Sequence, residues 1–218
     1  MSHEPPNAHP PPPAPPTRAW HGESLSFFEP AFAPLIVSWV RSEQELTWLA
    51  PGTAPPLTPE KVIAWGRANE RRFMLWREGT SLPIAYAELN NMPDSSDQMW
   101  IGHFLVDPAH RERRNGTRFA QALLACAFQR FGARDVLLVV FPDNTGAIRC
   151  YQRAGMTALG HERKRFEATG REHVFLRMGI TGATYREMVA SGQIPSDVPV
   201  VRSRLTVLPI ATSRQPRA

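Results

Sequence analysis

Hydrophobic residues recur along the chain at two spacings, one typical of strands and the other typical of helices. Short alternating or continuous apolar runs bounded by turn residues predict strands at 24–30, 72–79, 82–89, 98–107, 135–141, 157–166 and 171–180. Apolar residues three and four positions apart predict one or two short helices within 34–50, and further helices after Thr58, across 117–131 and across 144–155. This order of segments is typical of a mixed α/β fold, a sheet flanked by helices.

Several predicted helices begin or end at residues that commonly occupy such positions. Thr58 is followed by Pro59, which is the pattern of an N-cap before the first helical residue. Asn144 stands at the start of a later helix, and Gly155 is placed to end it. These residues support the helical interpretation independently of the apolar spacing.

Composition divides the chain into three parts. Residues 1–21 are dominated by proline and contain little to bury, so we expect a disordered, partly polyproline-II arm. Residues 22–180 carry the patterned segments and form the predicted single domain. Beyond it the patterning weakens, and we expect 181–218 to be a poorly ordered C-terminal extension. The sequence leaves open whether 185–193 forms a helical turn and whether 199–211 forms an added strand.

Charge and cysteine content narrow the class of protein only slightly. The net charge of +5 and the pI of about 9.9 favour an anionic partner, without choosing between a phosphate ligand, nucleic acid and a membrane surface. Cys126 and Cys150 fall in predicted helices without metal-ligand spacing, which favours a reducing environment and no metal site. No apolar run approaches the roughly 20 residues of a membrane span, and the N-terminus does not resemble a signal peptide. We therefore expect a soluble, cytoplasmic protein.

An arginine-rich loop, 111–116, joins a predicted strand to a predicted helix. The N-terminus of a helix presents free N–H groups and the positive end of the helix dipole, which together suit phosphate. Arginine adds planar donors that match phosphate oxygens. The loop has neither the Gly-Lys-Ser/Thr of a P-loop nor the G-x-G-x-x-G spacing of a dinucleotide fold. It predicts a phosphate-binding loop of another kind, and a basic solvated loop is the alternative.

Two motifs stand on either side of the predicted strand at 135–141. The first reads Arg111-x-x-Arg114-x-Gly116, and the second contains Asn144, Ala147, Tyr151, Gly155 and Met156. As a pair they resemble the acetyl-CoA-binding core of the GNAT superfamily of N-acetyltransferases, whose signatures are Q/R-x-x-G-x-G/A and an Asn followed by a helix with Ala, Tyr and a terminal Gly-Phe. The resemblance covers about 24–180 and implies a single-domain, GNAT-like mixed β-sheet flanked by helices.

The resemblance implies acetyl-CoA as co-substrate and assigns residues to hold it. Two strands, 98–107 and 135–141, would splay apart to admit the thioester, and Asn144 would line the slot. The backbone of Phe104, Leu105 and Val106 would pair with the pantetheine arm. The loop amides would hold the pyrophosphate, which makes candidates of Arg111, Arg113, Arg114, Asn115, Gly116 and Thr117. In this loop Arg114 replaces the first glycine of the family's signature.

The resemblance also implies catalytic roles for a few residues. Tyr151 would act as general acid toward the thiolate leaving group, with packing on the helix face as the alternative. Some family members carry a base six residues before Val106, where this chain has Trp100. His103 is one step out of phase with that position unless a bulge alters the strand, and Glu88 lies on the preceding strand. Both stay candidates for the general base, beside a water relay that needs no single base.

We therefore expect an acetyl-CoA-dependent N-acetyltransferase that acetylates a primary amine by direct attack in a ternary complex. A non-catalytic acyl-CoA-binding regulatory or interaction module is the alternative. A nucleic-acid binder is disfavoured because the arginines gather at one loop without an aromatic sheet face. The acceptor is expected to be a small-molecule or peptide amine, with neither nucleic acid nor membrane as partner; a homodimer stays open. Of Trp39, Trp48 and Trp65, near the expected acceptor pocket, we expect most to be core.

Overall fold

The computed structural model describes residues 20, 22–66, 71–195 and 198–201 of the chain, so the expectation for the arm at 1–21 lies outside the described residues except for Trp20. Eight strands form one sheet in the order β6-β7-β5-β4-β3-β2-β1-β8. The strands are β1 (Glu23–Phe27), β2 (Arg71–Arg77), β3 (Ala85–Asn91), β4 (Gln98–Val106), β5 (Asp135–Val140), β6 (Thr157–Phe166), β7 (Arg171–Thr181) and β8 (Val200–Val201).

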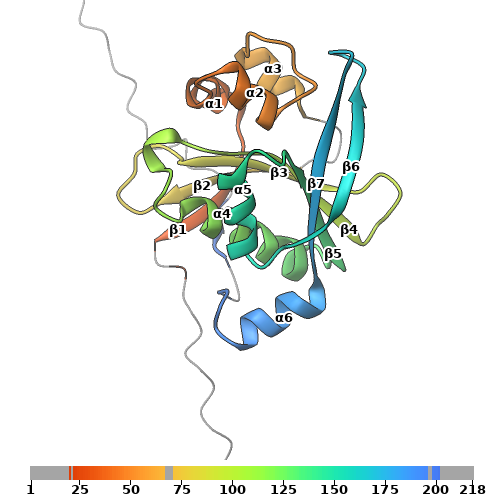
Figure 1. Cartoon of the computed structure of the whole chain (residues 1–218). Helices are drawn as coiled ribbons and strands as arrows, with labels where there is room; N and C mark the ends of the chain where they lie inside the picture. The colour runs from red at the N-terminus through yellow and green to blue at the C-terminus, as the bar shows by residue number, and fades with distance from the viewer. Residues whose placement is uncertain (1–19, 21, 67–70, 196–197, 202–218) are drawn as a thin grey trace, which may run out of the picture.

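Helices lie on both sides of this sheet (Figure 1). Three short helices, α1 (Ala33–Trp39), α2 (Glu43–Leu49) and α3 (Pro59–Ala64), form one layer, and η1 (Pro30–Phe32) leads into it. The opposite side carries α4 (Asn115–Ala125), α5 (Thr145–Arg153) and α6 (Gly182–Ala190). The 3-10 turn η2 (Pro108–His110) precedes α4, and a π-helical turn, η3 (Cys126–Arg130), extends it.

The sheet is mixed, as the sequence predicts. Strands β1 to β4 pair antiparallel in succession, β4 pairs parallel with β5, and β7 pairs antiparallel with both β5 and β6. The parallel step between β4 and β5 needs a crossover, and α4 supplies it. The predicted mixed α/β fold is therefore confirmed.

Two apolar cores hold the layers to the sheet. On the α1–α3 side, buried residues that include Ile36, Trp39 and Val62 pack with Met74, Trp76 and Tyr86 of the sheet. On the other side, the apolar face of α4 packs with the other face of the strands in a core that includes Phe119, Leu123, Leu75, Ile101 and Leu138. The helical spacing predicted for 117–131 thus marks the buried face of α4.

The predicted helix ends are confirmed. The Thr58 hydroxyl accepts a hydrogen bond from the Lys61 amide at the start of α3, and Asn144 accepts one from the Ala147 amide at the start of α5. Gly155 follows α5 with φ +101°, a left-handed conformation that side chains other than glycine adopt rarely.

The segment after β7 is more ordered than expected. The structure forms α6 where the sequence left a helical turn open, and Ile194 and Val198 are fully buried in the larger core. The chain then returns to the sheet as β8, which pairs parallel with β1. The prediction of a poorly ordered extension from 181 is therefore wrong for this part. Ile194 and Val198 are too far apart in sequence to form a periodic apolar pattern, and each is buried individually. Residues 202–218 lie outside the described part of the chain.

Strands β4 and β5 diverge soon after they meet. Their pairing comprises Gln98 with Asp135, Met99 with Val136, and Trp100 with Leu137. Strand β4 continues to Val106 on its β3 side, whereas its β5 side has no strand partner beyond Trp100 among the described residues. The splayed pair expected from the resemblance is present, and it opens toward the N-termini of α4 and α5.

A buried ion pair ties α4 to the first strand. The Glu23 carboxylate is 5% exposed, and both of its oxygens accept from Arg118 Nη1, at 2.9 and 2.8 Å. Glu23 begins β1 and Arg118 lies in the first turn of α4, so the contact holds the crossover helix against the first strand of the chain.

We predict that Glu23→Gln lowers the free energy of unfolding by about 1–3 kcal/mol, because it leaves a partly buried guanidinium without its countercharge. The matched control is Glu187→Gln on the exposed face of α6, expected to change stability by less than about 0.5 kcal/mol. Urea unfolding of both variants measures the difference. Equal midpoints for the two variants would show that the pair does not stabilise the fold.

Candidate active site

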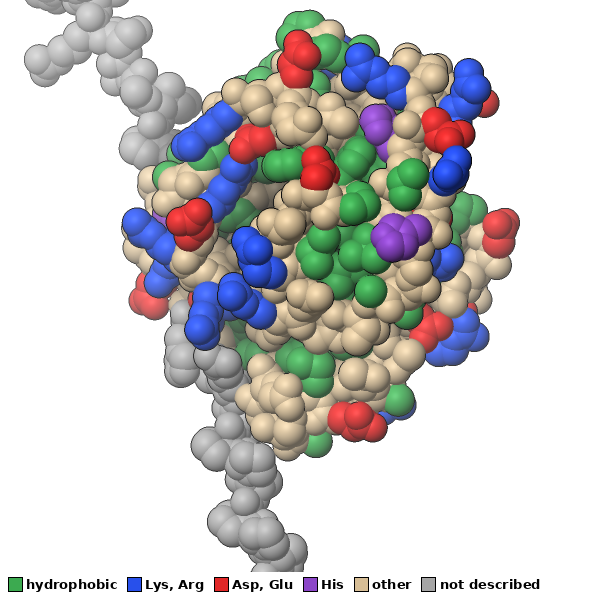
Figure 2. All heavy atoms as spheres, viewed as in Figure 1, with side chains coloured by type: hydrophobic (Ala, Val, Ile, Leu, Met, Phe, Trp, Pro, Cys, Tyr) green, Lys and Arg blue, Asp and Glu red, His purple; other side chains and the backbone are tan. Residues whose placement is uncertain are grey.

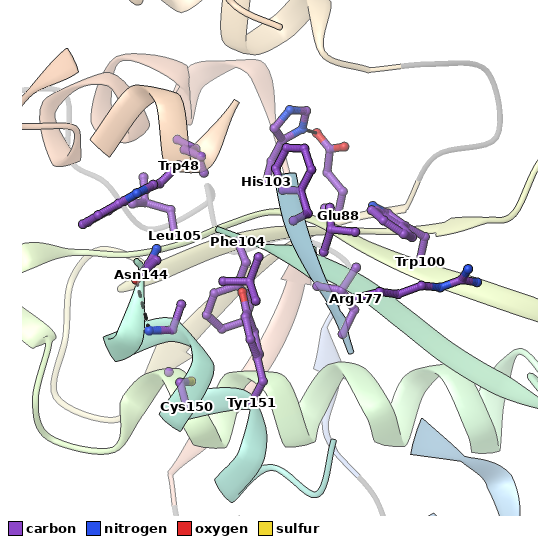
Figure 3. A pocket seen from close by; sticks show the side chains of 18 of the residues that line it. Trp48, Glu88, Trp100, His103, Phe104, Leu105, Asn144, Cys150, Tyr151 and Arg177 are labelled. Atoms are coloured by element: carbon purple, nitrogen blue, oxygen red, sulfur yellow. Dashed lines mark hydrogen bonds and ion pairs between the residues drawn. The ribbon is translucent and has the colours of Figure 1, made fainter. Parts of the chain in front are cut away.

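One large pocket, of about 1360 Å³, lies at the mouth of the split between β4 and β5 (Figure 3). Four parts of the fold line it: the α2–α3 layer, the β3–β4 pair, the N-terminal turn of α4 together with α5, and the β6–β7 hairpin. Residues from these parts, in the same order, are Trp48 and Trp65, Glu88 and His103, Gly116 and Tyr151, and Phe166 and Arg177. The pocket therefore joins the predicted phosphate loop to the predicted catalytic residues.

A bulge in β4 decides where His103 points. Tyr86 pairs with Leu105, but two residues along β3 Glu88 pairs with Gly102, three residues away on β4. The extra residue shifts the alternation of β4, and His103 adopts φ +42°. Regular alternation had placed His103 on the opposite face from the family's base position. The bulge instead brings His103 Nδ1 to 2.9 Å from Glu88 Oε1, so the two alternative bases form one pair.

Glu88 is held in a polar environment despite its burial. Its side chain is 3% exposed, and the Tyr86 hydroxyl donates to Oε1 at 2.8 Å. Burial raises the pKa of the Glu88 carboxyl, but His103, the Tyr86 hydroxyl and the positive charge of Arg72 together outweigh it, so the pKa lies below its usual 4.5. Glu88 is therefore an ionised residue that orients His103, rather than a carboxyl poised to take up a proton at neutral pH.

The His103 ring is fixed from a second side by Trp65. The two rings stack with centroids 4.3 Å apart and planes 14° apart. The ring is thus held between a carboxylate and an indole, and the His103 side chain remains 25% exposed on the pocket side. This is the arrangement in which a histidine tautomer is set by its acidic neighbour while the other ring nitrogen faces a ligand.

Tyr151 reaches the pocket from below the split (Figure 3). Its ring packs edge-on against Phe104, with centroids 5.4 Å apart, and its hydroxyl has no hydrogen-bond partner among the residues that the structure describes. Burial, and to a lesser degree the neighbouring Cys150, raises the pKa of the Tyr151 hydroxyl above its usual 10.0. The hydroxyl therefore keeps its proton at physiological pH.

Two of the predicted phosphate-loop residues use their side chains inside the protein. Arg111 pairs with Glu45 of α2 and donates from Nε to the Val106 carbonyl at 3.0 Å. Asn115 is buried, and its Nδ2 donates to the His110 carbonyl at 2.8 Å. Their side chains shape the loop. The Arg111 backbone amide donates to the Pro108 carbonyl at 3.4 Å, so of these two residues only Asn115 has a backbone amide available to a ligand.

The loop backbone is shaped for an anion. Glu112 and Arg114 adopt φ +63° and +60°, although neither is glycine. Such conformations cost on the order of 1–3 kcal/mol each and are found where a site requires them. The first backbone hydrogen bond of α4 runs from the Arg118 amide to the Arg114 carbonyl. The amides of residues 115–117 lie before this bond and have no partner among the described residues. Successive free amides of this kind form a phosphate-binding concavity.

Gly116 lies where a side chain would crowd the site. A Cβ at this position would come to 3.0 Å from Cys150 Sγ and 3.6 Å from Val106 Cγ2. Glycine therefore permits α4 to start close to both β4 and α5. Exposed arginines surround this turn, and Figure 2 shows Lys and Arg side chains gathered on the side of the molecule where α4 lies. Those exposed are Arg113 and Arg114 at the start of α4, and Arg149 and Arg153 along α5.

Asn144 and the indole above it close one end of the pocket. The Asn144 Oδ1 atom caps α5, which leaves its Nδ2 free to face the pocket that it lines. Next to it, Asp143 Oδ1 accepts from the Trp48 indole at 3.1 Å, which links α2 to the start of α5. Figure 3 shows Trp48 and Asn144 together at this end.

The sequence interpretation placed three tryptophans near the expected acceptor pocket but expected most of them to be core, and it did not name Arg177. Trp39 is core, as expected, but Trp48 and Trp65 are half-buried and line the pocket. Apolar periodicity cannot separate a core tryptophan from one at the rim of the same helix layer. Arg177 of β7 also lines the pocket, and only a pairing of β7 with β5 could have revealed it, because its neighbours in sequence are those of an ordinary outer strand.

The described residues contain no group of three His, Cys, Asp or Glu side chains that could hold a metal ion. Among the same residues, no helix is both long and apolar enough to cross a membrane. The chemical groups gathered in the pocket are thus a histidine–carboxylate pair, a protonated phenol and a row of free backbone amides.

Solved structures with the same fold include several acetyltransferases. The spermidine N-acetyltransferase from Vibrio cholerae in complex with CoA and spermine is 18% identical with a TM-score of 0.63, over 76% of this chain and 98% of that chain. The aminoglycoside acetyltransferase AAC(6')-Ib in complex with coenzyme A is 17% identical with a TM-score of 0.60, over 76% and 98%. A GNAT-family acetyltransferase from Bacillus anthracis is 14% identical with a TM-score of 0.63, over 75% and 96%. At these identities the likeness shows the fold.

The sequence itself carries the family assignment. No curated protein matches the chain. The sequence profile of the acetyltransferase (GNAT) family, however, matches residues 36–156, which is more than half of the 218 residues and includes both motifs, the bulged strand and the split. The chain belongs to the acetyltransferase (GNAT) family.

Proposed function

We propose that this protein is an acetyl-CoA-dependent N-acetyltransferase that acetylates a primary amine by direct attack in a ternary complex. The observation that carries the proposal is the continuity of one pocket, from the free amides at the start of α4, along the unpaired edge of β4, to His103 and Tyr151. Family membership and neighbours crystallised with CoA support the choice of co-substrate.

The described residues fit acetyl-CoA at both ends of its length. The amides of residues 115–117 would hold the pyrophosphate, and the exposed guanidiniums of Arg113 and Arg114 would add countercharge. The edge of β4 at Phe104 and Leu105, which β5 leaves open, would pair with the amide groups of the pantetheine arm. The Val106 carbonyl already accepts from Arg111, so we assign this residue an apolar contact instead.

His103 is the proposed general base. An attacking amine must lose a proton, and a histidine beside a carboxylate is suited to accept it directly or through one water. Glu88 is the positioning residue, because its ionised carboxylate lies against Nδ1 and leaves Nε2 for the acceptor. The two candidates for the base thus take separate roles.

Tyr151 is the proposed general acid. As the amine attacks, the bond between the acyl carbon and sulfur breaks, and the departing thiolate needs a proton. The Tyr151 hydroxyl is protonated, faces the pocket and has no partner among the described residues that would compete for that proton.

A cysteine intermediate does not fit the site. Burial raises the pKa of the Cys150 thiol to about 11, in spite of the Thr117 hydroxyl and Arg153 nearby, so the thiol is not ionised at neutral pH. Cys126 is fully buried in the core. Neither is a nucleophile for an acyl group, which favours direct transfer.

We predict that Tyr151→Phe and His103→Gln each lower kcat by roughly 10²- to 10⁴-fold, since each removes one proton-transfer group. Acetyl-CoA binding, measured by calorimetry, should stay near that of the wild type, because neither side chain holds the co-substrate. The matched control is Cys150→Ala, next to Tyr151, which should keep turnover. Unchanged turnover in both test variants, or binding of acetyl-CoA without transfer to any amine in the wild type, would favour a non-catalytic acyl-CoA-binding module instead.

The ionised state of Glu88 gives a pH signature in stability. The folded-state pKa lies below the usual 4.5, so the stabilisation from this carboxylate is present above that pH and is lost as the pH falls through the folded-state pKa. We predict that the stability difference between wild type and Glu88→Gln shrinks as the pH is lowered from about 7 to about 3. Urea unfolding across that range measures it. A constant difference would mean that Glu88 is not ionised in the folded protein.

A further inference from the structure

Arg177 and Glu88 lie at two ends of one row across the sheet. Arg177 pairs with Val139 of β5, and Glu88 pairs with Gly102 of β4. Because Trp100 pairs in parallel with Leu137, Gly102 and Val139 are at the same level of their strands. Three inter-strand spacings, roughly 14 Å, separate the Cα atoms at the two ends, and the split widens that distance. Between them the row carries a glycine and a valine, and the Trp100 indole lies beside the glycine, with Nε1 3.5 Å from where a Cβ of Gly102 would be.

Arg177 has no countercharge among the described residues. Its Nε is buried without a hydrogen-bond partner, and none of the ion pairs of this part of the chain includes it. The two arginines of the α4 region that point inward behave differently, because Arg111 is paired with Glu45 and Arg118 with Glu23. A guanidinium in a pocket wall without a partner is a site for an anionic group of a ligand.

The charged neighbours of Arg177 do not neutralise it. Glu162 and Lys164 of β6 line the same pocket, and they are one carboxylate and one ammonium. Glu162 pairs in register with Phe175, two residues from Arg177, and makes no ion pair with it among the described residues. The local balance of the β6–β7 wall is therefore one positive charge in excess.

The opposite end of the row offers acceptors. Asn90 Oδ1 is buried and has no hydrogen-bond partner among the described residues, while Asn90 Nδ2 lies 3.4 Å from Glu88 Oε2. Together with the Glu88 carboxylate and His103, this end suits an amine, whose N–H groups need acceptors. Figure 3 shows Glu88 and His103 above the sheet and Arg177 extending on the side of Trp100.

The far end of the pocket is closed by the β6–β7 hairpin. The Thr169 hydroxyl donates to the Pro51 carbonyl at 3.4 Å, and a Cβ on Gly52 would come to 3.1 Å from the Phe166 ring. The hairpin thus meets the loop between α2 and α3 and bounds the acceptor end. A bounded pocket favours a small acceptor over a long folded segment.

We propose that the acceptor is a small amine that also carries a carboxylate, such as an amino acid or a short peptide, with its carboxylate on Arg177 and its amine at His103. The inference rests on the proposed function and adds the class of acceptor. It sets this chain apart from the structural neighbour crystallised with spermine, a ligand with no acidic group. The contact with Arg177 makes the residue a determinant of specificity rather than a catalytic residue.

The test compares ω-amino acids, from glycine to aminohexanoate, with the amide of each, which has the same shape without the charge. Calorimetry on the protein saturated with CoA, which has no acyl group to donate, reports acceptor binding apart from transfer. The same titration without CoA measures acceptor binding even if CoA does not bind to the protein. We expect at least one acid to bind roughly ten- to a hundredfold more tightly than its amide. Arg177→Met should abolish that preference, and Arg177→Lys should restore part of it.

Arg163→Met is the matched control, because Arg163 lies on β6, is exposed and pairs with Glu172 outside the pocket. It should keep the preference for acids. Equal binding of acids and amides, or an equal loss for both in Arg177→Met, overturns the proposal. Failure of CoA to bind, or acids that bind without being acetylated when acetyl-CoA is supplied, counts against the proposed function instead.

Discussion

The site depends on one constraint in the sheet, which is that the parallel pairing of β4 with β5 ends after three residue pairs. Backbone amides and carbonyls in the interior of a sheet need partners, and each one left buried without a partner costs about 1–3 kcal/mol. The edge of β4 beyond Trp100 therefore requires water or a ligand that brings its own amide groups. A chain of the pantetheine type meets that need, and the free amides of α4 stand at the end of the same edge.

Packing below the sheet keeps the split open. Phe104 of β4 contacts both Phe119 of α4 and Tyr151 of α5, with ring centroids 5.1 and 5.4 Å apart. Gly116 permits α4 to approach α5 at Cys150, so the two helices meet beneath the diverging strands. The ring of Tyr151 thus packs beneath the point where β4 and β5 diverge, while its hydroxyl has no partner among the described residues. Structural and catalytic roles for Tyr151, which the sequence offered as alternatives, are compatible in this geometry.

The order of elements, the helix caps and the two motifs could be predicted from the sequence because each rests on local patterns. The arrangement of the proposed catalytic residues could not. His103 and Glu88 come together through a bulge next to Gly102. The sequence analysis allowed for a bulge in this strand, but regular alternation alone could not tell that it turns His103 toward Glu88. The inward roles of Arg111 and Arg118 depend on Glu45 and Glu23, which are distant in sequence. The same holds for Arg177, whose place in the pocket follows from strand order alone.

A calorimetric titration of the whole chain with acetyl-CoA tests the central claim most directly, because it asks whether the split is a ligand site. The account predicts that one molecule binds per chain with a dissociation constant between about 1 μM and 1 mM, the usual range for enzyme substrates. It also predicts that binding weakens as salt is raised, because the loop amides and arginines hold phosphate charge. No binding of acetyl-CoA at millimolar concentration would contradict it, since the unpaired edge of β4 would then need another partner.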